Sequence, residues 1–193
     1  MGAVERRSKQ RAELRGQILE AARRIVLCEG YRALTMRRIA EAVEYSPAAI
    51  YQYFENRDAI AKALMDQGFE ELAKVLEAAA AAEEPGERLS AVARAYVGFG
   101  LEHPETYRLM FMEDPEITAS FLENASQYSD AGERAYAALL ASGVDKTTAD
   151  ALWTSLHGIV ALKLTCPRFP ETPTGQLVDT VLRAYSGLSP SPT

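Results

Sequence analysis

The chain has 193 residues, 48% of them hydrophobic and 25% charged, a composition typical of a globular protein with a buried core. Its net charge of −6 argues against a protein whose whole surface grips nucleic acid. The N-terminus lacks the apolar run of a secretory signal, and no stretch of about 20 apolar residues could span a bilayer, so we expect a cytoplasmic protein.

Charge is divided unevenly along the chain. Residues 1–43 contain ten Lys and Arg against five Glu, a net charge of +5, so the total of −6 leaves −11 for residues 44–193. Such asymmetry predicts a basic module that meets an anion, followed by an acidic body with another task.

The first predicted helix has an apolar residue every three or four positions, the repeat of one helix face. The apolar positions are Leu14, Ile18, Ala22, Ile25 and Cys28. Gly30 can end this helix in a left-handed conformation. The opposite face has Arg11, Arg15 and Arg23.

Two short helices are predicted next. Thr35 is a suitable N-cap for a helix over residues 36–43, in which Ile39, Ala40 and Val43 point inward. Ser46 is a suitable N-cap for a third helix that begins at Pro47, because proline lacks the N–H that the first helical position leaves unpaired. Two short helices joined by the turn at 44–46 fit a helix-turn-helix, whose second helix enters the major groove of DNA.

The third helix has the composition of a DNA-reading surface. Its inward side, with Leu34 and Ile39, contains Ile50 and Phe54. Its outward residues are Ala48, Ala49, Tyr51, Gln52 and Tyr53. Small residues allow close approach to base edges, glutamine can bind an adenine edge, and tyrosine hydroxyls bind phosphate. The start of the preceding helix offers further phosphate contacts through Thr35, Arg37 and Arg38. The alternative is that the aromatic residues are core and the arginines a solvated face.

Residues 39–60, IAEAVEYSPAAIYQYFENRDAI, resemble the TetR family of bacterial transcription regulators. The matching features are T-x-x-x-I-A at residues 35–40, the turn that ends at Ser46, I-Y-x-Y-F at 50–54 and N-R-D at 56–58. Glu44 departs from the family, whose turn usually has glycine there. The predicted DNA-binding residues are Thr35, Arg37, Arg38, Ser46, Pro47, Ala48, Ala49, Tyr51, Gln52, Tyr53 and Arg57.

The rest of the chain is predicted to be helical as well. Asn56 can cap a long helix that runs to about Ala82, Pro104 and Pro115 suit first helical turns, and Asp114 and Asp145 suit N-caps. Residues 147–164 and 175–188 have the pattern of two final long helices, and no run alternates as a strand does. The fold class is therefore all-α, with about nine helices. The predicted domains are a helix-turn-helix domain at 1–55 and a helical effector-binding and dimerisation domain at 56–188, followed by a disordered tail at 189–193.

The predicted body contains an aromatic and methionine group. Trp153, His157 and Gly158 look like the W-x-x-x-H-G signature of one type of TetR C-terminal domain, and the first two share a helix face. The predicted ligand-binding residues are Tyr96, Phe99, Tyr107, Met110, Phe111, Trp153 and His157. Apolar walls with few polar tips suit a small, largely apolar ligand with a hydrogen-bonding group. The alternative is that this aromatic stripe is simply core.

Resemblance to the TetR family also implies an assembly. Its last two helices pair with those of a second copy, which implies a homodimer with two reading heads roughly 34 Å apart on a near-palindromic operator. A ligand that changed this separation would release the DNA, as expected of a repressor. A DNA-binding regulator without an effector is the alternative, and a helical protein-interaction module is a further one.

The sequence lacks the motifs of catalysis and metal binding. It contains no Gly-rich phosphate loop, nucleophile elbow or metal cluster, and neither His103 nor His157 has a second ligand at a zinc-like spacing. We therefore expect no catalytic residues, metal or cofactor. Cys28 and Cys166 lie far apart, which indicates free thiols in a reducing compartment, with redox sensing as the alternative.

Overall fold

The computed structural model describes residues 2–82, 84, 87–113, 118 and 130–186. Within them the chain forms nine α-helices, one 3-10 turn and no strand, which confirms the all-α fold class. The elements are α1 (Ala3–Glu29), η1 (Tyr31–Ala33), α2 (Met36–Ala42), α3 (Pro47–Ile50), α4 (Arg57–Ala82), α5 (Arg88–Glu102), α6 (Pro104–Phe111), α9 (Ala131–Leu140), α10 (Lys146–Thr165) and α11 (Thr174–Ser186). The predicted tail at 189–193 and the helix start at Asp114 and Pro115 lie outside the described residues.

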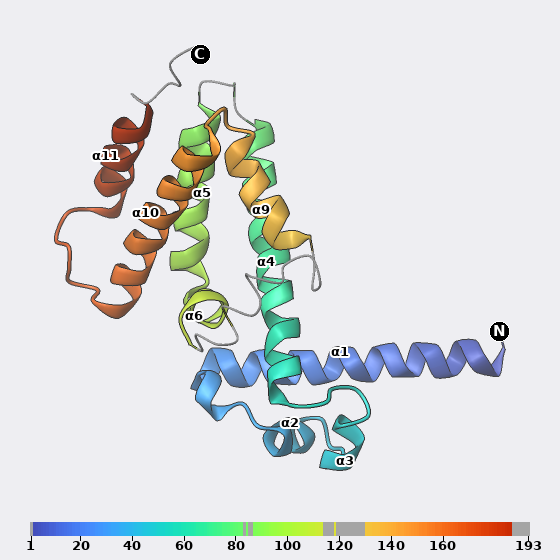
Figure 1. Cartoon of the computed structure of the whole chain (residues 1–193). Coiled ribbons are helices and arrows are strands. Elements are labelled where there is room, and N and C mark those ends of the chain that lie inside the picture. Colours follow the sequence, from blue (N-terminus) through green and yellow to red (C-terminus); the bar gives the residue numbers. More distant parts are fainter. Residues whose placement is uncertain (1, 83, 85–86, 114–117, 119–129, 187–193) are drawn as a thin grey trace.

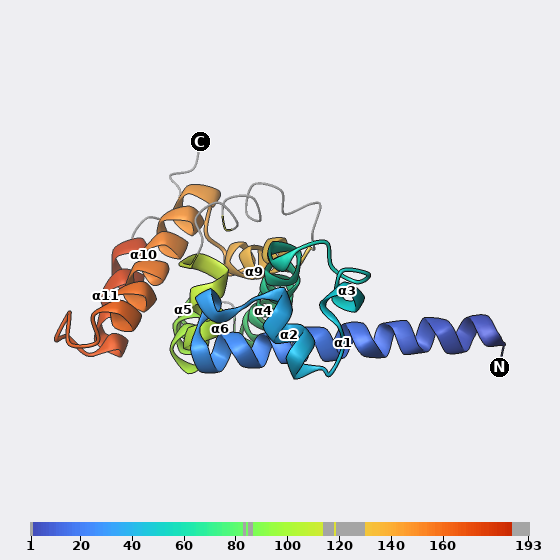
Figure 2. The ribbon, with the colours of Figure 1, turned by 90° about the horizontal axis from the view of Figure 1, so that it is seen from below.

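The N-terminal helices form a small module at one end of the molecule. Helix α1 lies across this end, α2 and α3 pack beneath it, and its N-terminal part extends well beyond every other element (Figures 1 and 2). Helix α4 rises from the module into the body and packs against α1, α5 and α9. Because α4 contacts both parts of the chain, the predicted division at residue 55 stays a prediction.

The body consists of α5, α6, α9, α10 and α11 arranged around the upper part of α4 (Figure 1). Helix α10 packs on α5, and α11 lies on the outer side of both. Gly100 permits the closest approach, since a Cβ there would stand 2.5 Å from Val160 Cγ1 and 3.0 Å from Tyr107 Cδ2. The described part of the chain includes no helix both long enough and apolar enough to cross a bilayer.

Four of the predicted helix N-caps form the expected hydrogen bonds. Backbone N–H groups in the first turns of α2, α3, α4 and α10 donate to the side chains of Thr35, Ser46, Asn56 and Asp145, over 3.2, 3.3, 2.8 and 2.9 Å. Pro47 and Pro104 occupy the starts of α3 and α6, as predicted. These helix starts are local, because each cap satisfies N–H groups within its own turn.

Three local predictions need correction. Gly30 ends α1 at a positive φ of 81°, but its ψ of 165° lies outside the left-handed helical region. Cys28 is exposed rather than part of the buried face of α1, although both cysteines are free thiols, as predicted. The third helix ends at Ile50, and residues 51–53 form turns instead of continuing it.

The turn between α2 and α3 places a glutamate where glycine is favoured. The Tyr45 N–H donates to the Ala40 carbonyl at 3.0 Å and the Glu44 N–H to the Glu41 carbonyl at 3.3 Å, the two bonds of a Schellman motif. Glu44 has a φ of 60°, and a non-glycine residue in that left-handed region costs about 1–2 kcal/mol. The departure from the family noted in the sequence is therefore a strained position.

Replacing Glu44 by glycine is expected to raise the free energy of unfolding by about 0.5–1 kcal/mol. The relieved strain exceeds the extra backbone freedom that glycine gives the unfolded chain, which offsets about 0.4–1 kcal/mol. Urea denaturation at unchanged slope measures the gain. Glu55→Gly is the matched control, because Glu55 is exposed and has no positive φ, and it should destabilise. Equal losses in both variants would refute strain at Glu44.

Candidate nucleic-acid interface and buried aromatic cluster

The helix-turn-helix is held together by the inward residues predicted from the sequence. Leu34, Ile39 and Ile50 are fully buried, and Phe54 is 5% exposed. They belong to one hydrophobic cluster with Ile18 of α1 and with the body. This core fixes the orientation of α3. Phe54 belongs to the core, whereas Tyr51 is exposed, so the aromatic residues of this region do not all serve as core.

The reading stretch, residues 47–53, presents its exposed side away from that core. Tyr51 is 55% exposed, and Ala48 and Gln52 are also exposed. Ala49 and Tyr53 are half-buried, so they offer less surface than the outward pattern predicts. Tyr45, just before the stretch, is 48% exposed, although the site prediction leaves it out. Because Tyr45 lies in the turn and not on a helix face, helical periodicity could not predict its exposure.

The predicted phosphate-binding arginines lie around this stretch and already have acidic partners. Arg37 pairs with Glu41 at 2.8 Å, and Arg38 of the same helix pairs with Glu29 of α1. Both pairs are solvent-exposed, and such pairs contribute only about 0–1 kcal/mol, so exchange for a phosphate partner costs little. The hydroxyls of Thr35 and Ser46 accept the cap hydrogen bonds but keep their O–H free to donate.

Arg57 differs from the other predicted contacts. Its guanidinium lies 4.7 Å from the centre of the Tyr31 ring, and its Nε donates to Asp58 at 3.2 Å. It thus joins the start of α4 to η1 and is half-buried. This packing favours a role in setting the angle between α4 and the module over an extended reach into solvent.

Two arginines of α1 contact the reading stretch or the residue that follows it, and the site prediction does not include them. Arg11 lies 5.8 Å from the centre of the Tyr53 ring and donates to the Gln52 carbonyl at 3.5 Å. Arg15 lies 5.0 Å from the centre of the Phe54 ring. Contacts across about 40 residues of sequence cannot be inferred from the chain. The only sequence signal was the repeat of arginine on the polar face of the first helix.

A polar chain crosses the interior of the body. The Tyr96 and Tyr107 hydroxyls lie 2.9 Å apart, and the Tyr107 hydroxyl lies 2.7 Å from His157 Nδ1. Both tyrosines are buried, and burial raises both pKa values, so their phenols stay protonated at neutral pH. Burial also lowers the pKa of His157, which favours the neutral ring. Two hydrogen bonds, through the hydroxyls of Tyr96 and Tyr107 and one ring nitrogen of His157, therefore link α5, α6 and α10.

Aromatic rings surround this polar chain. Trp153 lies 4.8 Å from the Tyr96 ring centre, and Phe111 lies 5.4 Å from that of His157. Trp153, Phe111 and His157 are half-buried, so this side of the cluster reaches towards the surface of the chain. We call the five residues Tyr96, Tyr107, Phe111, Trp153 and His157 the aromatic cluster.

Two predicted ligand-binding residues point elsewhere. Phe99 lies 5.1 Å from the ring centre of His103, one turn further along α5. Met110 packs on α4, where a Cβ added at Gly68 would stand 2.7 Å from the Met110 sulfur. Both are buried among neighbouring helices. Helical spacing could not separate them from the cluster, because the choice of neighbour depends on how α4 and α6 cross.

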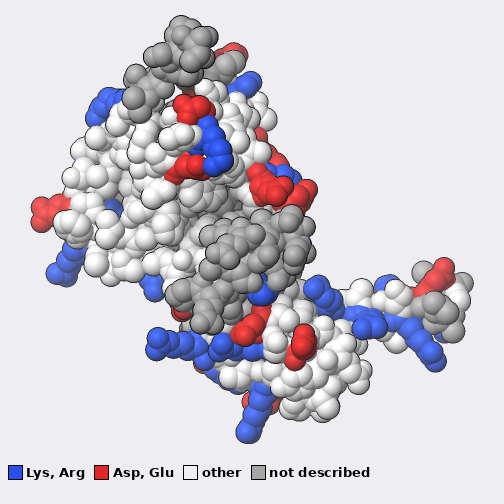
Figure 3. Space-filling model, viewed as in Figure 1, with Lys and Arg blue, Asp and Glu red and all other residues white. Residues whose placement is uncertain are grey.

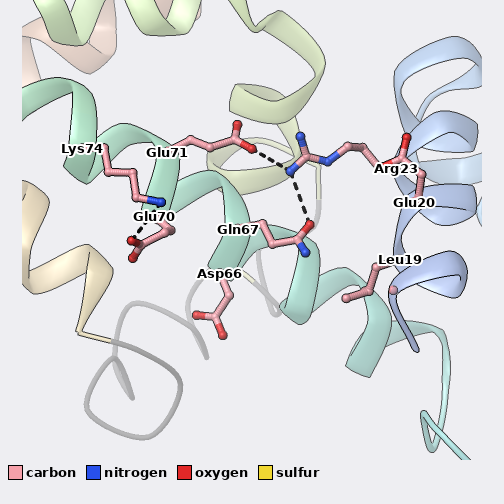
Figure 4. Close-up of a pocket in the computed structure, with 9 residues that line it drawn as sticks. Leu19, Glu20, Arg23, Asp66, Gln67, Glu70, Glu71 and Lys74 are labelled. Atoms are coloured by element: carbon pink, nitrogen blue, oxygen red, sulfur yellow. Dashed lines mark hydrogen bonds and ion pairs between the residues drawn. The ribbon is translucent and has the colours of Figure 1, made fainter. Parts of the chain in front are cut away.

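A polar cleft of about 520 Å³ lies between α1 and α4 (Figure 4). Arg23 of α1 reaches across it and donates to Glu71 at 2.7 Å and to Gln67 at 3.3 Å, both on α4. The cleft is lined by Gly16, Leu19, Glu20, Arg23, Asp66, Gln67, Glu70, Glu71 and Lys74. Arg23 thus joins the DNA-facing module directly to the helix that enters the body. Among the residues that the structure describes, no group of three His, Cys, Asp or Glu side chains could hold a metal ion.

Sequence comparisons point to bacterial regulators. Residues 18–64 match the family described as bacterial regulatory proteins, tetR family, and residues 89–185 match the tetracyclin repressor-like C-terminal domain. The HTH-type transcriptional regulator Rv1816 of Mycobacterium tuberculosis is 27% identical over 111 residues, 56% of this chain and 47% of the relative. The HTH-type transcriptional activator FasR of Mycolicibacterium smegmatis is 30% identical over 114 residues, 56% of this chain and 52% of the relative. The chain thus spans about half the length of these curated relatives.

Solved structures share the whole fold. A protein from Rhodococcus sp. RHA1 is 25% identical with a TM-score of 0.71, covering 89% of this chain and 93% of that one. The multidrug binding protein EbrR, complexed with imidazole, is 24% identical with a TM-score of 0.65, covering 94% and 92%. The SmeT–triclosan complex is 18% identical with a TM-score of 0.64, covering 88% and 90%.

The first family match covers the helix-turn-helix and extends into α4, and the second covers most of the helical body. The Trp-His-Gly subtype of the body stays a prediction. With a helix-turn-helix whose core is closed and whose reading stretch is exposed, the chain belongs to the TetR family of bacterial transcription regulators.

Proposed function

We propose that the protein is a repressor that binds a near-palindromic operator as a homodimer in the bacterial cytoplasm and leaves it when a small, largely apolar ligand enters the body. The observation that supports this most is the direct connection between its two parts. Helix α4 packs against α1 and against α5 and α6, two of the three helices of the aromatic cluster, and Arg23 bridges α1 to α4. A change in the body therefore has a mechanical route to the reading stretch.

In the operator complex, α3 enters the major groove. Ala48 lies against base edges, Gln52 binds one base, and Tyr51 donates its hydroxyl to a phosphate. Arg37 and Arg38 exchange their glutamate partners for phosphates on either side of the groove. The exposed positions of Ala48, Tyr51 and Gln52 support these roles.

The dimer forms through the outer faces of α10 and α11. On α10 this face contains the small residues Gly158 and Ala161 beside Leu162, which is 41% exposed. A Cβ added at Gly158 would meet nothing within 4 Å, so a second helix can approach closely there. Other apolar residues of α10, such as Leu152 and Leu156, are buried within one chain. The remaining apolar strip is narrow and favours close helix pairing.

The ligand binds at the open side of the aromatic cluster. Trp153 and Phe111 supply apolar walls, and the Tyr107–His157 pair supplies a proton donor and an acceptor for one polar group. EbrR and SmeT, which share the fold, are solved with imidazole and with triclosan, both of which contain aromatic rings. Entry of such a ligand wedges α6 and α10 apart, tilts α4 and alters the separation of the two reading heads.

Binding of the purified protein to the DNA upstream of its own gene tests the proposal. Fluorescence anisotropy is measured at two salt concentrations with excess unrelated duplex, followed by selection from random duplexes. We expect salt-sensitive binding that survives competitor, and a selected site with two inverted halves about one helical turn apart. Binding that competitor abolishes, together with selection that enriches no inverted site, would contradict an operator-specific repressor.

Gln52→Ala is expected to relax preference at one base position in each half-site. The lost pair removes about 1–3 kcal/mol of discrimination between bases there, whereas affinity for unrelated duplex should hardly change. Affinities for the selected site and its single-base variants measure the effect. Glu55→Ala serves as a control, since Glu55 is exposed near the stretch but outside it. An unchanged preference at every position would exclude base reading by Gln52.

A further inference from the structure

The N-terminal part of α1 projects from the molecule, and Arg11 is its contact with the reading stretch. Every side chain from Glu5 to Glu13 is exposed, and in Figures 1 and 2 this segment extends past α3 into open space. The space-filling view shows Lys and Arg along it (Figure 3). Burial of apolar side chains does not stabilise this segment, because all its side chains are exposed. We therefore look for its role in its charged side chains. We call residues 5–13 the arm.

Three arginines of α1 form a row that runs from the reading stretch out along the arm. Arg7, Arg11 and Arg15 are spaced by four residues, so they lie on one face of α1. Arg15 and Arg11 stand against Phe54 and Tyr53, so this face points to the side of the module where α3 lies. Arg7 is therefore on the same face, one turn further out, where α3 no longer covers it.

Arg7 is also an available charge. Among the described residues, no ion pair is formed by Arg7, whereas Lys9 on another face of the arm pairs with Glu13 at 3.9 Å. Eight residues separate Arg7 from Arg15, about 12 Å along the helix axis, which equals roughly three or four base pairs of B-DNA. A duplex held against α3 therefore continues alongside the arm.

We propose that the arginine ridge Arg7–Arg11–Arg15 binds the phosphate backbone just outside each half-site, with Arg7 making the outermost contact. This inference rests on operator binding by α3. Arg11 and Arg15 are oriented by their aromatic neighbours, so little side-chain freedom is lost when they meet phosphates. The contact is independent of base sequence and lengthens the footprint on each side by about three or four base pairs.

The salt dependence of binding by Arg7→Gln tests the ridge. The variant keeps the exposed helix, because glutamine has nearly the helix propensity of arginine. Two arms per dimer lose two phosphate contacts, so the slope of log affinity against log salt should fall by about 1.8. The advantage of the wild type over the variant should then shrink about 12-fold between about 50 and 200 mM salt.

A second variant on the same arm and a shorter duplex distinguish a specific contact between Arg7 and a phosphate from a general electrostatic attraction between the arm and DNA. Lys9→Gln removes the same charge from another face and should change the slope by less than half as much. Trimming about two base pairs from each end of the selected duplex removes only the phosphates that Arg7 reaches beyond Arg11, so it should lower wild-type affinity to the level of Arg7→Gln and leave the variant unaffected. An unchanged slope in Arg7→Gln, or equal changes in both variants, would overturn the ridge while wild-type binding stands. Failure of the wild type to bind any duplex would instead contradict the operator proposal.

Discussion

Replacing Ala48 by aspartate is expected to abolish operator binding while the protein stays folded. Ala48 is exposed in the first turn of α3, so a larger side chain there disturbs no packing. A carboxylate in the first turn of a helix is slightly favourable for folding, by about 0.3–1 kcal/mol. Against the DNA it is strongly unfavourable, because a negative charge about 4–5 Å from a phosphate costs roughly 3–4 kcal/mol in a partly solvated interface.

Two half-sites double that penalty to roughly 6–8 kcal/mol, so we expect affinity to fall by more than about 10,000-fold, measured by anisotropy on the selected duplex. Thr147→Asp is the matched control: it places the same carboxylate at the second position of α10, also exposed, but in the body. Its operator affinity should match the wild type. If Ala48→Asp bound as tightly as Thr147→Asp, with normal thermal unfolding in both, α3 would not be the reading helix.

Tyr107→Phe is expected to lower the free energy of unfolding by about 2–3 kcal/mol, although it removes a single oxygen. That oxygen bonds both the Tyr96 hydroxyl and His157 Nδ1, so its loss strands two polar groups. A buried polar group left without a partner costs about 1–3 kcal/mol, less for the half-buried histidine. Urea denaturation measures the loss.

Tyr136→Phe is the control for this substitution, because the Tyr136 hydroxyl bonds Asp150 at the surface of the body. Its removal should cost below about 1 kcal/mol, because Asp150 is solvent-exposed and stays paired with Lys146. Similar losses in the two variants would mean that the buried hydrogen bonds of Tyr107 stabilise the fold no more than a surface hydrogen bond does.

Tyr107→Phe also tests the ligand site. If the ligand shares a proton with Tyr107 and His157, Tyr107→Phe should hold the operator normally but need about tenfold more ligand for release, equivalent to one lost hydrogen bond. A panel of small, largely apolar compounds supplies the probes for the release assay. Unchanged release in Tyr107→Phe by a ligand that works on the wild type would place the binding site elsewhere.

The sequence alone was enough to predict the helix starts, part of the core and the family. The caps at Thr35, Ser46, Asn56 and Asp145 depend on hydrogen bonds within one helical turn, so local residue types were enough to locate the helix starts. The inward residues Ile39 and Ile50 follow from the pattern of their own helices, which requires no knowledge of the partner helix. The family followed from the same short stretch.

Only the tertiary structure decided what depends on how helices cross. The sequence placed Phe99 and Met110 with Tyr107 because all lie at helical spacing, yet their neighbours are His103 and α4. It gave no reason to join Arg11 to the reading stretch, 41 residues away, or Arg23 to Glu71, 48 residues away. Such contacts arise from packing of elements that are distant in the chain, and periodicity reports only which face of a helix is buried, never what buries it.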